Sequence, residues 1–543
     1  MSRTWIKLPA TGSNLQDDYG ESGGSLFKGS NSLYLGVVAM IIVAALFYRL
    51  KDLSDRPMHH DEANQAVRCG ILQETGVYKY DPLDHHGPSL YYLTLPFTWI
   101  TSGRDFSGTT IATFRIVPVL FGVGLILLLL PLTDAMGRTA VILSALLTAI
   151  SPGMVYYSRF FIQEKLLVFF SLALISSFWR YLKSGKAYLA VIAGLSAGMM
   201  YATKETCVIS WAAMTLGLMA VAAVMPRGDG VVRPSCVRHI LFAAVAAAVI
   251  VILFFSSFFT NMAGPLDSIK AYSGYLGKGV STDTGHTHPW DYYITMLGWT
   301  KSSGGLVWTE GIINILAAVG FIGAFLPLNN RETHKGFARF IAIYTLAMIV
   351  VYSLLSYKTP WCALSFLHGM ILLAGMGGAF LLGVGNNAFS KVIIIILLLL
   401  GLVHLRTISH RVNGRFAADE RNPYAYVHTS RVFMKLVERI EDLSSVHESG
   451  KDMFIQVVAP PDKTWPLPWY LRDYSKVGYW TSPEEMVDVP EPAVLITVPE
   501  YSELLSTGIE NNYISEYHSV RAEVLMSVYI RNDLWNEFME TRK

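Results

Sequence analysis

The residues best suited to chemistry lie in one polar segment, RPMHHDEANQAV, which follows the first apolar stretch of the chain. It places His60, Asp61 and Glu62 in succession at the start of an amphipathic pattern. An ionised carboxylate can take a proton from a hydroxyl group, and a helix beside a membrane would hold that carboxylate in place. We therefore expect Asp61 to be the reactive carboxylate. The alternative is a solvated loop, in which acidic residues and histidines occur freely.

Three cations form a second group of candidates, because Arg159, Lys204 and Lys358 each lie in a short segment between apolar runs. Such cations can hold an anionic group such as a phosphate. The alternative is that each extends its charged end toward the lipid headgroups. We favour phosphate binding for Arg159 and Lys358, and both interpretations stand equally for Lys204, whose neighbour Glu205 can offset its charge. Arg115, inside an apolar run, is expected to be buried and either functional or paired.

Six histidines in two segments raise the question of a metal ion, with Asp61 and Glu62 as companion ligands. Adjacent His-His pairs are not a specific ligand spacing. We expect no metal or other cofactor, and a divalent ion is the alternative. The histidines are His59, His60, His85, His86, His286 and His288.

The elements that must position these residues are membrane helices. Of the 543 residues, 52% are hydrophobic and only 15% are charged, whereas a soluble domain carries about a quarter charged residues. A spanning helix needs about 20 mostly apolar residues. Eleven runs qualify approximately: 33–49, 110–133, 139–157, 164–182, 187–202, 206–225, 238–259, 305–327, 339–356, 361–384 and 391–406. The apolar piece Pro88–Ile100 is too short to cross and is predicted to be interfacial or re-entrant.

The distribution of Lys and Arg predicts the orientation. The loops after 133, 182, 225 and 327 are basic and are expected to be cytoplasmic, so that the loops 50–109 and 260–304 face outward. Arg406, Arg411 and Arg415 follow the last run and on the simple rule would be cytoplasmic. We nevertheless place them outside. This parity requires that Pro88–Ile100 does not span.

The ends of the chain differ in character from its centre. Residues 1–32 are polar, lack a signal-peptide pattern and are expected to be cytoplasmic. Residues 33–406 form the predicted transmembrane domain, and residues 407–543 predict a small soluble α/β domain, with FIQVVAP and AVLITV as buried strands and VFMKLVERIEDL as a helix. The net charge of +2 gives no basic field for nucleic acid. The four cysteines are scattered singly, without a disulfide or zinc pattern.

The pattern DEA, an amphipathic helix, Gly-x-Tyr and then HHGPSLYYL resembles the first outer loop of the GT-C glycosyltransferases of family 39, the protein O-mannosyltransferases and lipid A aminoarabinose transferases. The resemblance implies a GT-C fold in which Asp61 is catalytic. His86 and Gly87 stand where the family carries a basic residue and a proline, so the match is partial.

Later stretches extend the resemblance. SPGMVYYSRFFIQEKLLVFF resembles the second acidic motif and puts Glu164 in its place, with Arg159 before it. GHTHPWDYY, with His288 and Trp290, resembles the His-Pro-aromatic motif of the large outer loop, and LLSYKTPW resembles the basic element that carries Lys358. With TWPLPWYLRDY near the C-terminus, the sum is most similar to the family named flippase-activity-associated membrane proteins.

The resemblance implies a multi-pass protein of the cell membrane that transfers a sugar from a polyprenyl-phosphate donor to a glycan, lipid or protein acceptor. Asp61 would act as the base, supported by Glu62 in orientation or a cation contact and by Glu164. The predicted ligands of the donor phosphate are Arg159, Lys358, Lys204 and His86. The predicted substrate contacts are His60, His85, His288 and Trp290. A non-catalytic partner of a lipid-linked sugar flippase and, less favoured, a secondary transporter are the alternatives.

Overall fold

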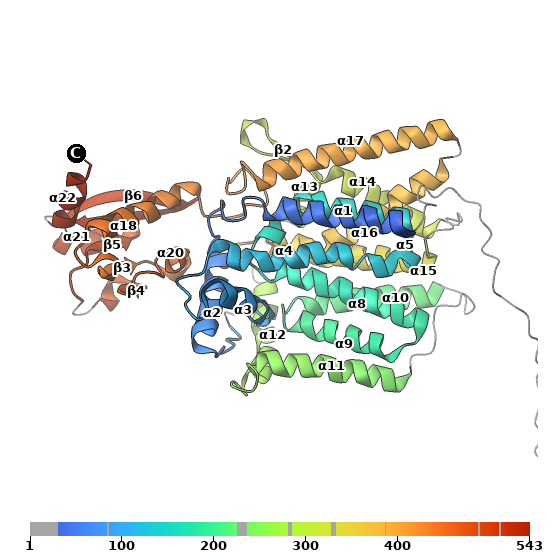
Figure 1. Ribbon diagram of the computed structural model, residues 1–543, viewed down its shortest axis with the longest axis horizontal. Helices are drawn as coiled ribbons and strands as arrows, with labels where there is room; N and C mark the ends of the chain where they lie inside the picture. Colours follow the sequence, from blue (N-terminus) through green and yellow to red (C-terminus); the bar gives the residue numbers. More distant parts are fainter. Residues whose placement is uncertain are drawn as a thin grey trace, which may run out of the picture.

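The structure, a computed structural model, describes residues 31–83, 86–224, 236–280, 285–326, 333–385, 387–486, 489–509 and 512–542. A bundle of long helices makes up most of the molecule, and a smaller domain with a β-sheet lies beyond one end of the bundle (Figure 1). The predicted N-terminal segment 1–32 lies almost wholly outside the described residues.

Seven helices or joined helices of the described chain are long and apolar enough to cross a membrane. They are α1 (Asn31–Leu50), α4 (Ile111–Leu127) with α5 (Thr133–Met136), α8 (Glu164–Ser184), α11 (Val237–Phe255), α15 (Lys335–Leu354), α16 (Leu364–Val384) and α17 (Ala388–Asn413). An eighth span is broken by a bend of 61° between α6 (Arg138–Ile150) and α7 (Pro152–Tyr156) with the short η2 (Tyr157–Arg159). Three shorter apolar helices, α9 (Ala187–Tyr201), α10 (Cys207–Val224) and α14 (Gly311–Phe325), complete the bundle.

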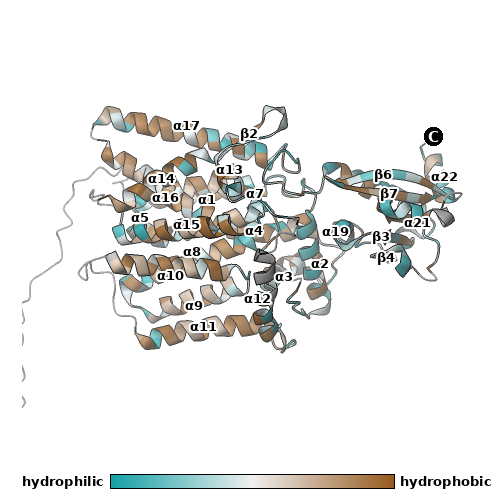
Figure 2. Cartoon of the chain, turned by 180° about the vertical axis from the view of Figure 1, so that it is seen from behind, coloured by the Kyte–Doolittle hydropathy of each residue, from teal (hydrophilic) through white to brown (hydrophobic). Residues whose placement is uncertain are grey.

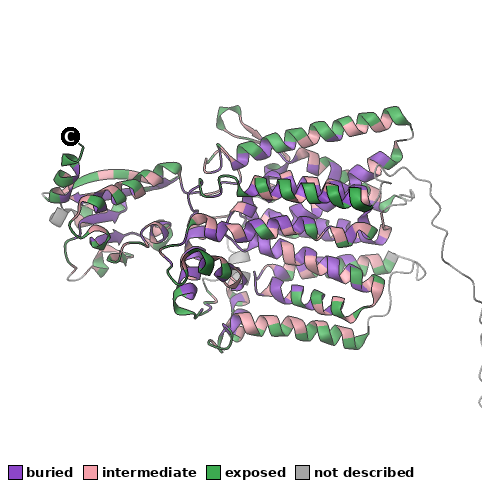
Figure 3. Ribbon diagram, in the orientation of Figure 1, coloured by how far each residue is buried: buried purple, intermediate pink, exposed green. Residues whose placement is uncertain are grey.

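The outer surface of this bundle is apolar, as a membrane requires. None of the apolar stretch of α11 is buried within the protein, and exposed helical faces are largely hydrophobic (Figures 2 and 3). An apolar surface of this extent is unfavourable in water but matches the lipid interior. The chain is therefore an integral membrane protein.

Glycines let neighbouring helices of the bundle come close. A Cβ atom on Gly320 of α14 would lie 2.0 Å from the carbonyl oxygen of Leu373, and one on Gly377 of α16 would lie 2.1 Å from that of Leu316. Without side chains at these positions, the two backbones pack directly against each other, which is a common way for membrane helices to associate.

Two helices that precede α4 do not cross the bundle. α2 (His60–Thr75) and α3 (Ser89–Ser102) lie at the end of the bundle that faces the smaller domain (Figure 1). The 14 residues of α3 extend about 21 Å at 1.5 Å per residue, less than the roughly 30 Å of a bilayer core. α3 thus has the size and place of the interfacial segment predicted for Pro88–Ile100.

The structure corrects two predicted boundaries and shows two helices within a predicted loop. α17 continues to Asn413, beyond the predicted end at 406, because Leu405, Ile408 and Val412 keep one face buried in its last turns. α14 begins at Gly311 rather than at 305, since β1 (Thr300–Lys301), η3 (Ser303–Gly305) and β2 (Val307–Trp308) form a hairpin there. The predicted loop 260–304 contains α12 (Gly264–Val280) and α13 (Tyr292–Gly298).

The smaller domain is the predicted α/β domain. Its five-stranded sheet has the order β4-β3-β5-β7-β6, in which β3 (Ile455–Val458) runs parallel to β4 (Val477–Trp480) and β5 (Val494–Thr497). β7 (Val524–Arg531) is antiparallel to β5 and to β6 (Tyr513–Arg521). The helical elements of the domain are η5 (Arg431–Phe433), α18 (Met434–Val446), η6 (Gly450–Asp452), α19 (Pro461–Thr464), α20 (Leu467–Tyr470), η7 (Pro483–Glu485), α21 (Pro499–Ile509) and α22 (Asn532–Glu540).

An aromatic contact fixes this domain to the bundle. The ring of Trp469, on α20, lies 5.3 Å from the ring of Phe114 and 5.7 Å from that of Phe106. Arg472 stacks on Trp469 and donates a hydrogen bond to the carbonyl oxygen of Thr109 (2.7 Å). The Tyr470 hydroxyl accepts a hydrogen bond from the backbone N–H of Met58 (2.9 Å), so the domain also contacts the segment that leads into α2.

Candidate functional site

The first turn of α2 is held by a reciprocal cap. His59 is the residue before the helix, and its Nδ1 accepts a hydrogen bond from the backbone N–H of Asp61 (3.1 Å). The backbone N–H of His59 donates to Oε2 of Glu62 (3.1 Å). Because Nδ1 is an acceptor, Nε2 of His59 carries the proton and donates to the carbonyl oxygen of Tyr426 (3.1 Å). These bonds set the position of the Asp61 backbone.

Glu62 is a buried structural centre. Its two oxygens accept from Nε (2.8 Å) and Nη2 (2.7 Å) of Arg115, and Oε1 also accepts from the backbone N–H of Phe161 (2.9 Å). Burial raises the pKa of Glu62, but the charges of Arg115 and Arg56 outweigh that effect and hold the pKa below its ordinary value. With both oxygens bonded and the side chain fully buried, Glu62 orients the helix. Glu62 thus makes the contact with a cation that the sequence analysis allowed for it, and this cation is the buried Arg115.

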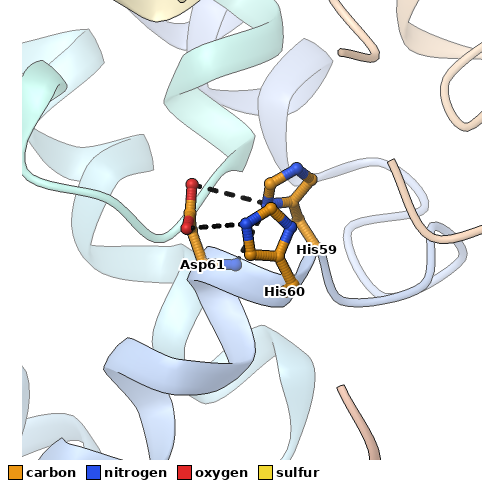
Figure 4. A group of neighbouring side chains, drawn as sticks. All are labelled: His59, His60 and Asp61. Atoms are coloured by element: carbon orange, nitrogen blue, oxygen red, sulfur yellow. Dashed lines mark hydrogen bonds and ion pairs between the residues drawn. The ribbon is translucent and has the colours of Figure 1, made fainter. Parts of the chain in front are cut away.

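Asp61 points in a different direction from Glu62, since consecutive residues of a helix do not face each other, and keeps 36% of its side chain exposed. Nε2 of His60 lies 3.1 Å from Oδ1 of Asp61, and Nδ1 of His59 lies 3.7 Å from Oδ2 (Figure 4). The second distance is no hydrogen bond, because that nitrogen already accepts from a backbone N–H. Burial alone would raise the pKa of Asp61, yet the neighbouring His60, His59 and His86 lower it well below its usual range. The carboxylate is therefore ionised and accessible.

Four further side chains lie close enough to Asp61 to interact with it electrostatically: His86, His286, Tyr357 and Arg521. We call these residues, with His60 and Asp61, the Asp61 centre. They come from five separate parts of the chain, including the C-terminal domain. The arrangement surrounds one carboxylate with groups that can carry positive charge or donate hydrogen bonds.

The segment with His86 is held against the turn between α9 and α10. Ser89 donates from its N–H to the carbonyl oxygen of Ala202 (2.9 Å), and a Cβ on Gly87 would lie 2.3 Å from that same oxygen. Glycine, which replaces the proline of the resembled motif, is thus the residue that fits. The contact brings Nδ1 of His86 within 2.9 Å of Glu205. Although burial opposes ionisation of Glu205, His86 lowers the pKa of this carboxyl group.

Lys204 and Glu164 form a buried ion pair beside this contact. Glu164 is the first residue of α8 and Lys204 lies in the turn after α9. Tyr357 interacts electrostatically with both, as well as with Asp61, so the pair lies next to the Asp61 centre. Glu205 therefore pairs with His86, and Glu164 is the carboxylate that offsets Lys204.

The two predicted motifs GHTHPW and LLSYKTPW lie side by side. Thr287 pairs with Tyr357 in an antiparallel bridge, and the N–H of Lys358 donates to the carbonyl oxygen of His286 (3.0 Å). The ammonium group of Lys358 donates to the carbonyl oxygens of His288 (3.0 Å) and Leu355. Burial lowers the pKa of Lys358. Backbone pairing therefore places Lys358 beside the histidines.

Not all predicted site residues gather there. Arg159 donates to the carbonyl oxygens of Lys51 (2.7 Å) and Asp52 (2.7 Å) and lines a different pocket, so the structure separates it from Lys204, Lys358 and His86. Trp290 is 66% exposed and, in the described part of the chain, is not among the residues that contact the centre. His85 lies outside the described residues.

Three residues at or beside the site were not selected from the sequence. Tyr426 bonds through its hydroxyl to Nδ1 of His286 (2.9 Å) and Nε2 of His288 (3.3 Å). Tyr357 stands beside Lys358 inside a motif that was already selected, whereas Arg521 is the last residue of β6. Arg521 donates to the carbonyl oxygens of Asp462 (2.7 Å) and Trp465 (3.4 Å). No pattern in the sequence around Arg521 indicates a role in the site, and only its position in the structure does.

The cluster His59, His60 and Asp61 brings three possible metal-ligating atoms within 4.8 Å of one another. Both ring nitrogens of His59 already take part in hydrogen bonds with the backbone. A metal ion would have to break the cap of α2 to use this imidazole, which leaves two neighbouring residues as ligands. The donor set therefore fits a metal ion poorly.

Residues 87–262 match the family model described as dolichyl-phosphate-mannose-protein mannosyltransferase. A comparison with curated protein sequences finds no match. Among solved structures, the chain is similar to ArnT from Cupriavidus metallidurans bound to undecaprenyl phosphate, with a TM-score of 0.61 and 13% identity, covering 92% of this chain and 99% of that one. It is also similar to the oligosaccharyltransferase AglB from Archaeoglobus fulgidus in complex with an inhibitory peptide and a dolichol-phosphate, with a TM-score of 0.57 and 12% identity, covering 95% and 78%.

The chain has the GT-C glycosyltransferase fold. The GT-C fold predicted from the sequence is thereby confirmed, as is the likeness to the mannosyltransferase family, whose match includes Glu164 and Lys204. Since the family match begins after Asp61 and the solved structures share little sequence identity, the roles of individual residues in this GT-C protein rest on its own geometry.

Proposed function

We propose that the protein transfers a sugar from a polyprenyl-phosphate donor to a hydroxyl-bearing acceptor at the outer face of the membrane, with Asp61 as the base. The observation that carries the proposal is the Asp61 centre, where one accessible, ionised carboxylate is surrounded by imidazole, phenol and guanidinium groups. The fold and the partial family match, both of glycosyltransferases, support the same reaction class.

The proposed reaction is a direct displacement with inversion. The acceptor oxygen forms a bond to the anomeric carbon while the bond from that carbon to the phosphate oxygen breaks, and Asp61 takes the acceptor proton. Because its pKa is low, Asp61 is a weak base toward a free hydroxyl group. Proton transfer is therefore late, when the forming bond has made the acceptor hydroxyl acidic.

The leaving phosphate needs positive charge that is not already cancelled. Lys204 is paired with Glu164 and His86 with Glu205, whereas Lys358 and Arg521 donate hydrogen bonds to neutral carbonyl oxygens. The carboxylate of Asp462 also interacts electrostatically with Arg521 but does not accept one of these hydrogen bonds. Carbonyl groups orient a cation without cancelling its charge. We therefore assign the donor phosphate chiefly to Lys358 and Arg521, with His86 and Lys204 as supporting groups.

The experiment is a transfer assay with purified protein and radiolabelled polyprenyl-phosphate sugars. Asp61→Asn keeps size but cannot accept the proton, so transfer is expected to fall at least about a hundredfold while donor binding stays near normal. Asp81→Asn is the matched control, since Asp81 is an exposed carboxylate of the same loop that bonds only the N–H of Leu83 in the described chain.

Two results would count against the proposal. Wild-type turnover by Asp61→Asn would remove Asp61 as the base. If the wild-type protein transferred no sugar from any carrier offered, a non-catalytic role beside a lipid-linked sugar flippase would become the better interpretation.

A further inference from the structure

A cavity of about 490 Å³ lies where α1 and α17 end on the side of the C-terminal domain. Six of its lining residues are cations: Lys51, Arg56, Arg115, Arg159, Arg415 and Arg431. Two acidic residues, Asp52 and Asp55, also line it. We call this cavity the basic pocket. Even when Glu62 behind Arg115 is included, the cations outnumber the carboxylates by three.

Glu62 neutralises Arg115, but hydrogen bonds to carbonyl oxygens orient Arg159 and Arg431 of the basic pocket without neutralising their charge. Arg159 donates to the carbonyl oxygens of Asn413 (3.1 Å), Lys51 (2.7 Å) and Asp52 (2.7 Å). Arg431 likewise donates to the carbonyl oxygen of Asp55 (3.2 Å). The Nε–H of Arg56 is buried and has no hydrogen-bond partner in the described chain. Guanidinium groups held in this way suit an anion with several oxygens, and a phosphate group is the common biological example.

The basic pocket is distinct from the Asp61 centre. Its lining includes Arg56 and Arg115, which contact Glu62, but it does not include Asp61. Glu62 is fully buried and does not line the pocket. No residue of the Asp61 centre lines the pocket, so the inference does not rest on the proposed transfer reaction.

The position of the pocket favours a lipid as the bearer of the phosphate. The hydroxyl group of Tyr48, near the end of α1, donates to Oγ of Ser409 on α17 (3.2 Å). Below this contact both helices expose apolar side chains, among them Phe47 (73% exposed) and Val403 (65% exposed). A lipid whose chains lie against these faces would bring its headgroup to the ends of α1 and α17. We propose that the basic pocket binds the phosphate-bearing headgroup of a membrane lipid.

The test measures binding of dioleoyl phosphatidic acid to the purified full-length protein by native mass spectrometry in detergent. Arg415→Gln with Arg431→Gln removes two exposed pocket cations and is expected to weaken binding about tenfold or more, since each cation near an anionic lipid contributes on the order of 1 kcal/mol. The matched control is Arg406→Gln with Arg411→Gln, two exposed cations at the same end of α17 that do not line the pocket.

Further binding measurements identify which part of the lipid is recognised. Dioleoylglycerol, which lacks the phosphate, is expected not to be retained, and inorganic phosphate at 100-fold excess is expected not to displace phosphatidic acid. Asp61→Asn is expected to bind it as the wild type does. Equal binding by the two double variants, retention of dioleoylglycerol, displacement by inorganic phosphate, or loss of binding in Asp61→Asn would each overturn the proposal.

Discussion

At the scale of single residues, the neighbouring carboxylates of Asp61 and Glu62 have different roles because consecutive positions of α2 point into different surroundings. Asp61 remains exposed among imidazoles, whereas Glu62 is enclosed by Arg115 and two backbone N–H groups. The sequence could identify the pair but could not divide the roles by residue type. Position in the helix and the buried Arg115 decide them, and Arg115 is distant from the pair in the sequence.

This division predicts opposite effects of two conservative substitutions. Glu62→Gln removes the charge that compensates Arg115, and leaving a buried charge without its partner costs about 3 to 5 kcal/mol. The temperature of unfolding, followed by fluorescence in detergent, is therefore expected to fall clearly for Glu62→Gln and little for Asp61→Asn. Transfer activity per folded molecule is expected to fall more for Asp61→Asn. A Glu62→Gln protein as stable as the wild type would refute the structural role of Glu62.

At the scale of elements, the length of each apolar run predicted where the helices of the bundle lie but not where each helix ends. Each predicted run corresponds to an apolar helix or, at 139–157, to a bent pair, because about 20 apolar residues in a row have few alternatives to a buried or lipid-facing helix. Of the eleven predicted spans, seven are long and apolar enough to cross a membrane, one is the bent pair and three are shorter apolar helices. The last turns of α17 escaped prediction because only one face there is apolar. The pairing of 286–288 with 355–358 is a contact between distant loops, which hydropathy does not encode.

The close contact of Gly87 with Ala202 can be used to test whether packing between segments positions His86. Gly87→Ala would place a Cβ atom 2.3 Å from a backbone oxygen, so the segment must move and carry His86 away from Glu205. Overpacking of this kind typically costs about 1 to 3 kcal/mol. We expect a lower temperature of unfolding and reduced transfer.

Gly383→Ala is the matched control, since a Cβ atom on Gly383 of α16 would meet no atom within 4 Å. If both variants had wild-type stability and activity, the Gly87 contact would not position His86.

At the scale of the whole molecule, the bundle has two chemically different ends. Arg138 begins α6, Arg180 and Lys183 lie near the end of α8, and Lys186 precedes α9. These helix ends lie away from the C-terminal domain (Figure 1). The Asp61 centre and the basic pocket lie at the end that carries the domain. Since short basic loops face the cytoplasm, the loops around α6, α8 and α9 favour an outward location of the site, whereas Arg406, Arg411 and Arg415 at the other end run against the simple rule.

Cysteine labelling tests that orientation. In a Cys236→Ser background, Lys301→Cys is expected to react with a membrane-impermeant maleimide in intact cells, because Lys301 is exposed at the C-terminal-domain end. Lys183→Cys, exposed at the opposite end, is expected to react only after the cells are opened. The reverse pattern would place the reaction on the cytoplasmic side.

Arg521 tests whether the C-terminal domain completes the site. Its guanidinium group donates to the carbonyl oxygens of Asp462 in α19 and of Trp465 just after it. It also interacts electrostatically with Asp61 across the junction of the two domains. If Arg521 stabilises the leaving phosphate, Arg521→Gln should lower transfer about 10- to 100-fold and weaken donor binding, because a desolvated charge contact contributes about 2 to 5 kcal/mol. Arg531→Gln serves as the control, since Arg531 pairs with Asp533 at the far end of β7.

Purified proteins would be compared by donor titration and single-turnover transfer, with the temperature of unfolding as a check on folding. An Arg521→Gln protein that bound donor and transferred sugar like Arg531→Gln would mean that the domain does not supply this charge, and the donor phosphate would then depend on Lys358 and the paired cations of the bundle alone.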